Sequence, residues 1–343
     1  MQRFNVLIIG AGPIGLEVGY WLQDAGFSSL NVDAGEIGHT IARLFPPSTR
    51  FFSSPERLAI AGIDCPVPTQ EKITGEEYLA YLRSVVITHQ LDVRTFSRVT
   101  AAVEVEDGFV VSLSEPSGGS HQVHAAKVVI ACGGTHRPRS LGIPGESLGH
   151  VQSDLGDPHR FFGRRVLIIG GKNSAVESAL RCWRAHADVT ISYRQSCIYE
   201  RVKYWLRPEV ESLIQEGRIR SCMPTRPLEI HPHHVVLENV ETCEQFNVPI
   251  DDVLLQIGYE QDDTLFRMFG VDCAGQQNAP VFNSDTMESS VPGVFIAGTA
   301  IAGTQHRYKS YIETSHGHGP RIVAALTGAP PPEVDAARVL PEG

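Results

Sequence analysis

Val6-Leu7-Ile8-Ile9-Gly10-Ala11-Gly12-Pro13-Ile14-Gly15-Leu16, near the start of the chain, joins four apolar residues directly to a Gly-x-Gly-x-x-Gly pattern. A helix-compatible segment follows from Leu16 to Ala25. This order predicts a buried strand, a tight turn and the N-terminus of a helix. In such a turn Gly10 allows the sharp reversal, Gly12 lets the backbone approach a pyrophosphate, and Gly15 lets the helix lie close to the strand.

A second apolar run, Leu30-Asn31-Val32, ends at Asp33, which Ala34 follows. A carboxylate at this distance from the glycines can accept hydrogen bonds from ribose hydroxyls. The first helical turn, which begins with Pro13 and Ile14, presents free N–H groups and a partial positive charge to phosphates. Strand, glycines, helix, strand and acid in this register predict a dinucleotide-binding unit.

Length and composition are those of a globular enzyme. The chain has 343 residues, 42% of them hydrophobic and 20% charged, which is enough for two domains with substantial cores. A net charge of −10 argues against binding to nucleic acids or to anionic membranes. The sequence contains no apolar run of membrane-spanning length. Met1 leads within a few residues into the first predicted strand, so we expect no signal peptide and a cytoplasmic protein.

The cysteine pattern argues against both disulfides and a zinc site. The seven cysteines are Cys65, Cys132, Cys182, Cys197, Cys222, Cys243 and Cys273. Their number is odd, they are scattered, and no two form Cys-x-x-Cys. The commonest dithiol redox motif of flavin reductases is therefore missing.

Between the first unit and the middle of the chain, the pattern predicts loops, one helix and a β-meander. Residues 34–47 are expected to form a loop across the cofactor, and Phe52 and Ser53 follow it. Phe52 is more typical of core packing than of a site, whereas Ser53 can donate to a ring carbonyl or a phosphate. Thr74 and Glu77 form a capping box that starts a helix. The expected meander strands are Arg98–Val105, Phe109–Leu113 and His121–Ile130.

The meander runs into Val128-Val129-Ile130-Ala131-Cys132-Gly133-Gly134, in which paired glycines follow an apolar strand. These glycines allow a second close approach of the backbone to the bound dinucleotide. Cys132 is interpreted as a small buried core residue, and a thiol beside the flavin is the alternative.

A second opening of the same kind starts at Arg165 and contains Gly170-Gly171-Lys172-Asn173-Ser174-Ala175. Ala175 replaces the third glycine, and Lys172 stands where a glycine often would. The next strand, expected over 188–193, ends at Arg194 instead of at an acid. An arginine there favours a 2′-phosphate, so the sequence indicates NADPH rather than NADH. Arg201 and Lys203 follow closely, and a solvated basic edge is the alternative interpretation.

In the C-terminal part, the pattern predicts a helix over 204–217 that Pro208 breaks or kinks near its start. Short strands are expected at Arg218–Cys222, Pro227–Ile230, Val235–Glu238 and 252–259, the last ending near Gly258. His231, His233 and His234 surround a proline and are interpreted as a solvated turn rather than as metal ligands. Gly298 and Thr299 end a further strand. A helix is expected over 311–326, its N-terminus pointing at the flavin. His306, His316 and His318 are candidates for proton delivery.

Two glycine turns in one chain imply two dinucleotides, FAD at the first and NADPH at the second. The nicotinamide would pass hydride to the flavin, which hands electrons onward. We expect an α/β protein with two Rossmann-like, three-layer ββα dinucleotide-binding domains. The FAD domain is expected over 1–155 plus 286–328, the NADPH domain over 156–285, and a flexible tail over 329–343. No metal is expected, and a homo-oligomer is plausible for this architecture.

The chain resembles the two-domain, thioredoxin-reductase-like flavoproteins and, within them, the bacillithiol-disulfide reductases of the YpdA type. The resemblance covers about residues 4–327. It rests on the first glycine turn, Phe51-Phe52-Ser53-Ser54, Ile168–Ala175, Val202–Pro208 and Tyr311-Ile312-Glu313-Thr314. It implies that Gly10, Gly12, Gly15 and Asp33 hold FAD, and that Gly170, Lys172, Asn173, Ser174 and Arg194 hold NADPH. Motif and resemblance together add Pro13, Ile14, Ala34, Phe52, Ser53, Cys132, Gly133, Gly171, Lys203, Gly258, Gly298 and Thr299 as cofactor-binding residues.

The sequence departs from this family at two positions. The disulfide reductases of this type carry a cysteine at the position of Ile14, and isoleucine cannot form a mixed disulfide. Thr299 stands where related reductases usually have an aspartate near the ribityl chain. The resemblance implies a low-molecular-weight disulfide such as bacillithiol disulfide as acceptor, without the family cysteine. The alternatives are an NADPH-dependent reductase of ferredoxin or flavodoxin, a flavin monooxygenase, and a non-enzymatic nucleotide-sensing protein.

Overall fold

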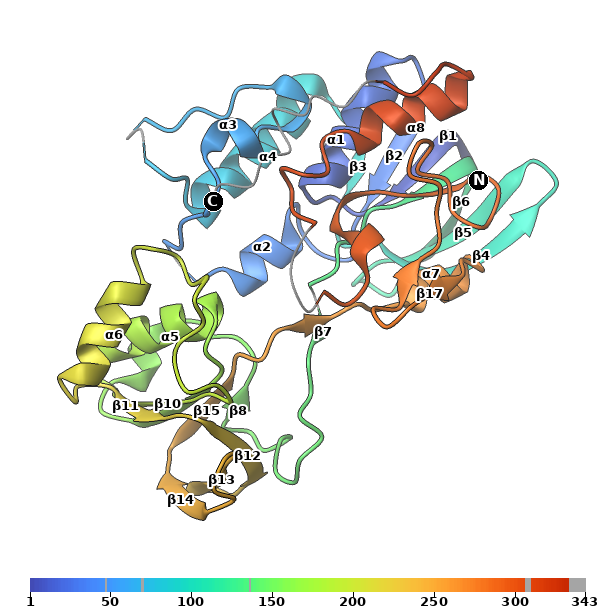
Figure 1. Cartoon of the computed structure of the whole chain (residues 1–343). Coiled ribbons are helices and arrows are strands. Elements are labelled where there is room, and N and C mark those ends of the chain that lie inside the picture. Colours follow the sequence, from blue (N-terminus) through green and yellow to red (C-terminus); the bar gives the residue numbers. More distant parts are fainter. Residues whose placement is uncertain (47, 69–70, 136, 306–309, 333–343) are drawn as a thin grey trace. The chain divides into compact units, whose positions relative to one another are not determined.

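The chain divides into two compact units (Figure 1). The computed structural model describes residues 1–46, 48–68, 71–135, 137–305 and 310–332. The first unit comprises the described residues of Met1–Arg137 and Tyr259–Gly343, and the second unit is Pro138–Gly258. This division lies at 137/138 and 258/259, whereas the expected boundaries are at 155/156 and 285/286.

The first unit contains a sheet whose central strands are parallel. Its order is β3-β2-β1-β6, and β19 pairs with the end of β6. The parallel strands are β1 (Gln2–Ile9), β2 (Ser29–Val32), β3 (Val93–Arg94), β6 (Ser120–Ile130) and β19 (Val294–Ile296). Leu7 lies between Leu30 and Val128 in the register. Because both faces of such a sheet are covered, Val6 to Ile9 are all buried, as their continuous apolar run predicts.

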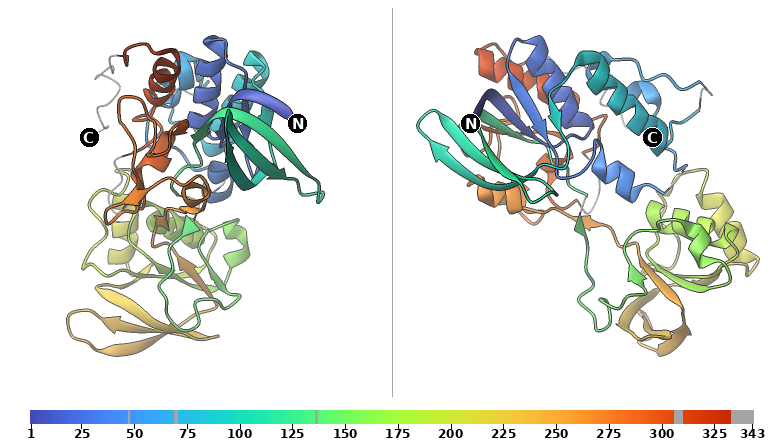
Figure 2. Two further views of the ribbon diagram at one scale, coloured as in Figure 1. Left: turned by 90° about the vertical axis from the view of Figure 1, so that its right-hand side faces the viewer. Right: turned by 180° about the vertical axis from the view of Figure 1, so that it is seen from behind.

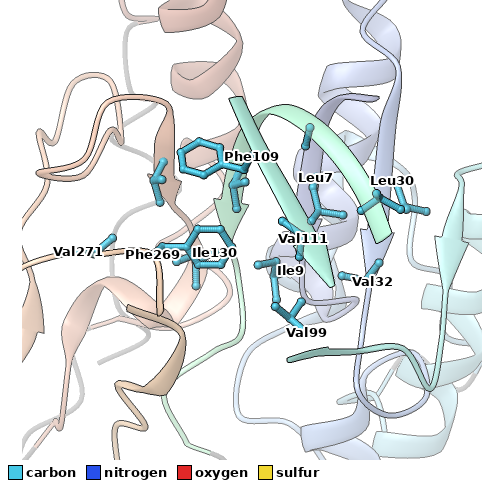
Figure 3. Packing of buried hydrophobic residues seen from close by; sticks show 14 of the residues in the cluster. Leu7, Ile9, Leu30, Val32, Val99, Phe109, Val111, Ile130, Phe269 and Val271 are labelled. Atoms are coloured by element: carbon cyan, nitrogen blue, oxygen red, sulfur yellow. The ribbon is translucent and has the colours of Figure 1, made fainter. Parts of the chain in front are cut away.

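The predicted meander is confirmed. β4 (Arg98–Val105) pairs antiparallel with β5 (Gly108–Ser114), which pairs with the first half of β6. Side chains from the meander, the parallel strands and the segment after α7 (Thr264–Met268) share one core. Figure 3 shows this packing, to which Phe109 and Phe269 contribute a ring pair with centroids 5.9 Å apart.

Helices complete the first unit (Figure 2). α1 (Pro13–Asp24) contacts both α8 (His318–Thr327) and α4 (Gly75–His89). Thr74 and Glu77 form the predicted capping box of α4. The shorter helical segments are α2 (His39–Leu44), α3 (Pro55–Leu58), η1 (Ile60–Gly62) and η3 (Gly298–Ala302).

Two expectations for these helices are wrong. Part of the segment expected to be a loop, over 34–47, forms α2. The last helix begins at His318 rather than at Tyr311, because Pro320 has no N–H to donate and is tolerated only in a first helical turn. Gly317 and Gly319 also disfavour an earlier start.

The second unit repeats the parallel arrangement on a smaller scale. Its sheet has the order β11-β10-β9-β15-β8, with every pair parallel. The strands are β8 (Val151–Gln152), β9 (Arg165–Ile169), β10 (Asp188–Ser192), β11 (Arg220–Cys222) and β15 (Asp252–Leu255). α5 (Asn173–Arg184) packs on β9 and β10, and contacts both η2 (Pro158–Phe161) and α6 (Arg207–Gln215). β10 ends at Ser192, one residue before the expected end at Tyr193.

A separate antiparallel sheet is formed by β12 (Thr225–Ile230), β13 (His234–Asn239) and β14 (Gln245–Pro249). The turn with His231 and His233 joins the first two strands, as predicted, and β14 was not foreseen. Two short pairs remain, β7 (Arg137–Pro138) with β16 (Tyr259–Glu260), and β17 (Cys273–Ala274) with β18 (Ala279–Pro280). No helix among the described residues is long and apolar enough to cross a membrane.

Candidate functional site

The first glycine turn contains two glycines that the protein's own backbone requires and a third that it does not require. Gly10 has a φ of +131°, and a Cβ there would overlap the Ala131 carbonyl oxygen. A Cβ at Gly15 would overlap the Gly10 carbonyl oxygen. Gly12, by contrast, has a φ of −80° and no atom within 4 Å of a Cβ position. Neither backbone conformation nor protein neighbours demand glycine at Gly12, so the open space in front of it fits an approaching phosphate.

Two polar side chains on β2 and just after it hold this turn. Asp33 accepts hydrogen bonds from the backbone N–H of Ala11 at 2.8 Å and of Gly35 at 2.9 Å. The buried Asn31 amide donates to the carbonyl oxygens of Gly10 at 3.1 Å and Gly15 at 2.9 Å. Sequence reasoning did not single out Asn31, although a polar residue inside a buried apolar strand is a usable indication.

The remaining predicted residues of this turn lie at its helix start or outside it. Pro13 opens α1, where its missing N–H costs nothing. Ala34 is exposed next to Asp33. Ile14 is buried, and its side chain packs against the backbone of Gly298, where a Cβ would lie 3.2 Å from the Ile14 Cβ.

The ends of β6 and β19 bring a second pair of predicted residues to the same edge of the sheet. A Cβ at Gly133 would lie 3.6 Å from the Thr299 Oγ1. Next to Gly133, burial raises the pKa of the Cys132 thiol to about 12, so this thiol stays protonated at neutral pH. The protonated state favours the interpretation of Cys132 as a core residue.

His318 fixes the backbone at this edge. The Gly298 N–H donates to the His318 Nδ1 at 3.0 Å, so this nitrogen carries no proton. Burial, followed by nearby Arg321 and His316, lowers the pKa of His318 to about 4. A neutral, buried acceptor is not a general acid at neutral pH, and the proton-delivery role expected for His318 does not fit this geometry.

His316 joins three segments of the first unit. Its Nδ1 lies 2.8 Å from the buried Glu17 carboxylate, and its Nε2 lies 2.8 Å from the Arg57 carbonyl oxygen. Glu17 also accepts a hydrogen bond from the Ala61 N–H at 2.6 Å. These contacts tie α1 to α3, to η1 and to the segment before α8, which is a structural role. The third candidate, His306, lies outside the described residues.

Phe52 and Ser53 have different surroundings. Ser53 is buried and donates to the Glu313 carboxylate at 2.6 Å. Phe52 is partly exposed, with the Lys72 ammonium 5.9 Å from its ring. Ser53 is thus engaged by the protein itself, and Phe52 retains exposed surface.

The second glycine turn has the same skeleton with different side chains. Gly170 has a φ of +141°, and a Cβ there would overlap the Gln256 carbonyl oxygen. The exposed Lys172 precedes α5, and Asn173 Oδ1 accepts a hydrogen bond from the Lys203 N–H at 2.8 Å. Ser174 is exposed in the first turn of the helix.

The Tyr193 ring covers Gly171, since a Cβ at that glycine would overlap three ring atoms. Arg194 follows and is exposed. Neither Arg194 nor Arg201 forms an ion pair with any residue that the structure describes. These guanidinium groups remain accessible to a phosphate.

Two other predicted residues of the second unit are less accessible. The Lys203 ammonium is largely buried and lies 3.4 Å from the Glu177 carboxylate. Gly258 accepts a hydrogen bond from the Arg139 N–H at 3.0 Å and ends the unit. Among the described residues, no three His, Cys, Asp or Glu side chains gather as metal ligands.

Comparison with known proteins assigns the family. The model of the pyridine nucleotide-disulphide oxidoreductases matches residues 7–298, a span that includes both glycine turns. The chain belongs to this family. It is an NADPH-dependent flavoprotein oxidoreductase with a thioredoxin-reductase-like fold, and its cofactors are FAD and NADPH.

Several known oxidoreductases are similar to most of the chain. Bacilliredoxin reductase Bdr from Bacillus subtilis (strain 168) is 32% identical over 327 residues, covering 95% of this chain and 98% of the relative. A ferredoxin–NADP reductase from Ignicoccus hospitalis is 25% identical over 301 residues, covering 86% and 89%. The structure of bacillithiol disulfide reductase Bdr (YpdA) from Bacillus cereus matches with a TM-score of 0.90 and 30% identity, covering 95% and 99%.

Proposed function

We propose that this oxidoreductase delivers electrons from its flavin directly to the acceptor, without a mixed disulfide at residue 14. The observation that carries this proposal is Ile14, which lies in the first glycine turn, buried against Gly298. An isoleucine side chain has no sulfur with which to attack a disulfide. Cys132, which follows the neighbouring strand β6, has a raised pKa and is a poor nucleophile.

The assignment of the two cofactors to the two turns is part of this proposal. FAD would lie at the first turn, with Gly10, Gly12, Pro13, Ile14, Gly15, Asp33, Ala34, Phe52, Ser53, Cys132, Gly133, Gly298 and Thr299 around it. NADPH would lie at the second, with Gly170, Gly171, Lys172, Asn173, Ser174, Arg194, Lys203 and Gly258. Together the bound cofactors supply hydride transfer from nicotinamide to flavin.

The residues of the chain bind and orient these groups. Gly12 leaves room for the pyrophosphate, and the free N–H groups of α1 stabilise its charge. Asp33 would accept hydrogen bonds from a ribose, since a carboxylate oxygen can accept more than the single backbone N–H that each one binds here. In the second unit, Arg194 supplies charge for a 2′-phosphate.

Two acceptor classes follow from the relatives. The names of two relatives refer to bacilliredoxin and to bacillithiol disulfide, which supports a low-molecular-weight disulfide. Another relative is named for ferredoxin, an acceptor that needs no protein thiol. The absence of a thiol at residue 14 favours ferredoxin or flavodoxin as the second candidate. A monooxygenase is less well supported, because the sequence carries no distinctive monooxygenase fingerprint between its two nucleotide turns.

An anaerobic acceptor screen on the NADPH-reduced protein tests the proposal. Bacillithiol disulfide, a ferredoxin, a quinone and then oxygen are added in turn, and flavin reoxidation is followed by absorbance. The screen uses a background in which the exposed Cys197 and Cys243 are replaced by serine, before and after alkylation. We expect turnover to survive alkylation in this background and to become alkylation-sensitive with Ile14→Cys. Loss of turnover on alkylation with Ile14 in place would contradict the proposal.

A further inference from the structure

The strand order of the first unit gives the dinucleotide a direction. The carboxyl ends of β2, β1, β6 and β19 meet at one edge of the sheet in this order. Asp33 follows β2, and the glycine turn follows β1. If a ribose lies at Asp33 and the pyrophosphate at Gly12, the rest of the molecule extends the other way. The ends of β6 and β19 therefore face the ribityl half of FAD.

Gln261 lies at these two strand ends with its amide orientation fixed. The residue is only 6% exposed. Its Nε2 donates to the carbonyl oxygens of Gly133 at 3.3 Å and of Asp262 at 3.4 Å, and its backbone N–H donates to the Thr304 Oγ1 at 2.9 Å. The opposite amide orientation would place an oxygen against two carbonyl oxygens, so the Oε1 direction follows from the hydrogen bonds.

The Gln261 Oε1 has no hydrogen-bond partner within the described part of the chain, although it is buried. It lies against Gly134, where a Cβ would be 2.9 Å from this oxygen and 3.0 Å from the Thr299 carbonyl oxygen. Buried acceptors are nearly always paired in native proteins, and an unpaired one is costly. An acceptor left unpaired beside Thr299 points to a donor that the ligand brings.

We propose that the Gln261 Oε1 accepts a hydrogen bond from a ribityl hydroxyl of FAD. The inference rests on the placement of FAD at the first turn. Gln261 is then a binding residue of the flavin, held ready by its own donors to Gly133 and Asp262. Without flavin, the Gln261 Oε1 lacks a hydrogen-bond partner among the described residues. Flavin binding would supply that partner and remove the cost of the unpaired acceptor.

The first test measures FAD affinity of the apoprotein by quenching of flavin fluorescence, together with its thermal unfolding. Gln261→Leu removes the acceptor, and Gln261→Met does so with an unbranched chain in case leucine does not fit. We expect FAD to bind about 10-fold more weakly to each variant. Gln122→Leu, at an exposed position of β6, is the matched control and should bind FAD as the wild type does. Unchanged FAD affinity in folded variants would overturn the inference.

The second test identifies the hydroxyl. FAD analogues in which one ribityl hydroxyl at a time is replaced by hydrogen are titrated into wild type and Gln261→Leu. One analogue should bind about 10-fold more weakly to the wild type and show no such loss in the variant. Equal losses in both proteins for every analogue would overturn the inference. Wild-type protein that binds no FAD would instead contradict the proposed function.

Discussion

The two glycine turns of this enzyme share a backbone arrangement and differ in the side chains around it. In each turn the first glycine donates its N–H to the last residue of the next strand, Gly10 to Val32 at 2.7 Å and Gly170 to Ser192 at 2.9 Å. These equivalent bonds place Asp33 and Tyr193 at the same position, directly after the strand. The fold thus provides the same backbone frame twice, and we propose that the side chains at a few positions select the dinucleotide.

The difference at this position extends to its neighbours. In the first turn, Asp33 accepts a hydrogen bond from the backbone N–H of Ala11, the residue between the first two glycines. In the second turn, the Tyr193 ring lies over the backbone of residue 171, so that only glycine fits there. The charged residue that we propose for the phosphate, Arg194, stands one position further along the chain. An acid after the strand suits ribose hydroxyls, whereas a ring followed by an arginine suits a 2′-phosphorylated nucleotide.

The largest expected effect is on FAD affinity, and it should follow substitution of Gly12 but not of Lys172, its counterpart in the second turn. Gly12→Val fills the open space in front of the first turn, and we expect FAD affinity to fall at least about 1000-fold, equivalent to about 4 kcal/mol. The apoprotein should unfold at the wild-type temperature, because a φ of −80° suits valine and no protein atom is near. Lys172→Val is the matched control and should leave FAD binding unchanged. Calorimetric titration with FAD measures the effect, and an unfolded Gly12→Val protein would contradict the assigned role.

The next effect concerns the stability of the protein at acid pH. His318 belongs to the first unit, so we expect its protonation to destabilise that unit and not the second. The pKa of His318 is lowered to about 4 from 6.5, so the unfolded state binds the proton more readily. The stabilisation is complete above about pH 6.5 and is lost as the pH falls towards 4. It amounts to about 3 kcal/mol.

Denaturant unfolding between pH 4 and 7 measures this contribution. His318→Asn keeps an acceptor for the Gly298 N–H and removes the titration. The difference in unfolding free energy between wild type and variant should change by about 3 kcal/mol across this range, shrinking towards acid pH. A constant difference would show that His318 titrates normally.

A smaller effect tests nucleotide choice at the second turn. Arg194→Gln removes an exposed guanidinium, and we expect the Kd for NADPH to rise about 30-fold, equivalent to about 2 kcal/mol for a charge-assisted contact. The Kd for NADH should not change, because it has no 2′-phosphate. Arg218→Gln, elsewhere in the second unit, is the control. Equal weakening of both nucleotides would mean that Arg194 acts on the fold of the loop.

The smallest effect is expected at Asp33. Asp33→Asn keeps one acceptor oxygen and loses the negative charge, so FAD affinity should fall about 10-fold. NADPH affinity should stay at the wild-type value, since Tyr193 occupies the corresponding place in the second turn. Asp24→Asn, at the exposed end of α1, controls for the loss of one charge. A fall in NADPH affinity of the same size would break the comparison between the turns.

Local patterns in the sequence predicted the elements of the fold. The glycine turns, the capping box at Thr74 and the three meander strands each depend on residues close together in the chain, and all appear as expected. The error at β10 is one residue, because Tyr193 is apolar enough to continue the strand pattern. α8 starts later than expected because of Pro320, whereas the prediction followed the spacing of apolar residues from 311 onward and did not take this proline into account.

The candidate site was less accessible from the sequence, because its contacts join distant segments. The pairing of His316 with Glu17 links residues 299 positions apart, and no local pattern indicates it. The Gly298 contact to His318 depends on the placement of β19 beside β6. Asn31 was readable in principle as a polar residue in a buried strand, but its two acceptors became apparent only in the fold.

Anaerobic titration of the purified, flavin-loaded protein with NADPH tests the central claim, that one chain holds FAD at its first turn and NADPH at its second for transfer between them. The visible absorption of oxidised flavin should bleach with one equivalent of NADPH, and Arg194→Gln should need a higher NADPH concentration for the same bleaching. Flavin that stays oxidised in saturating NADPH would contradict the account.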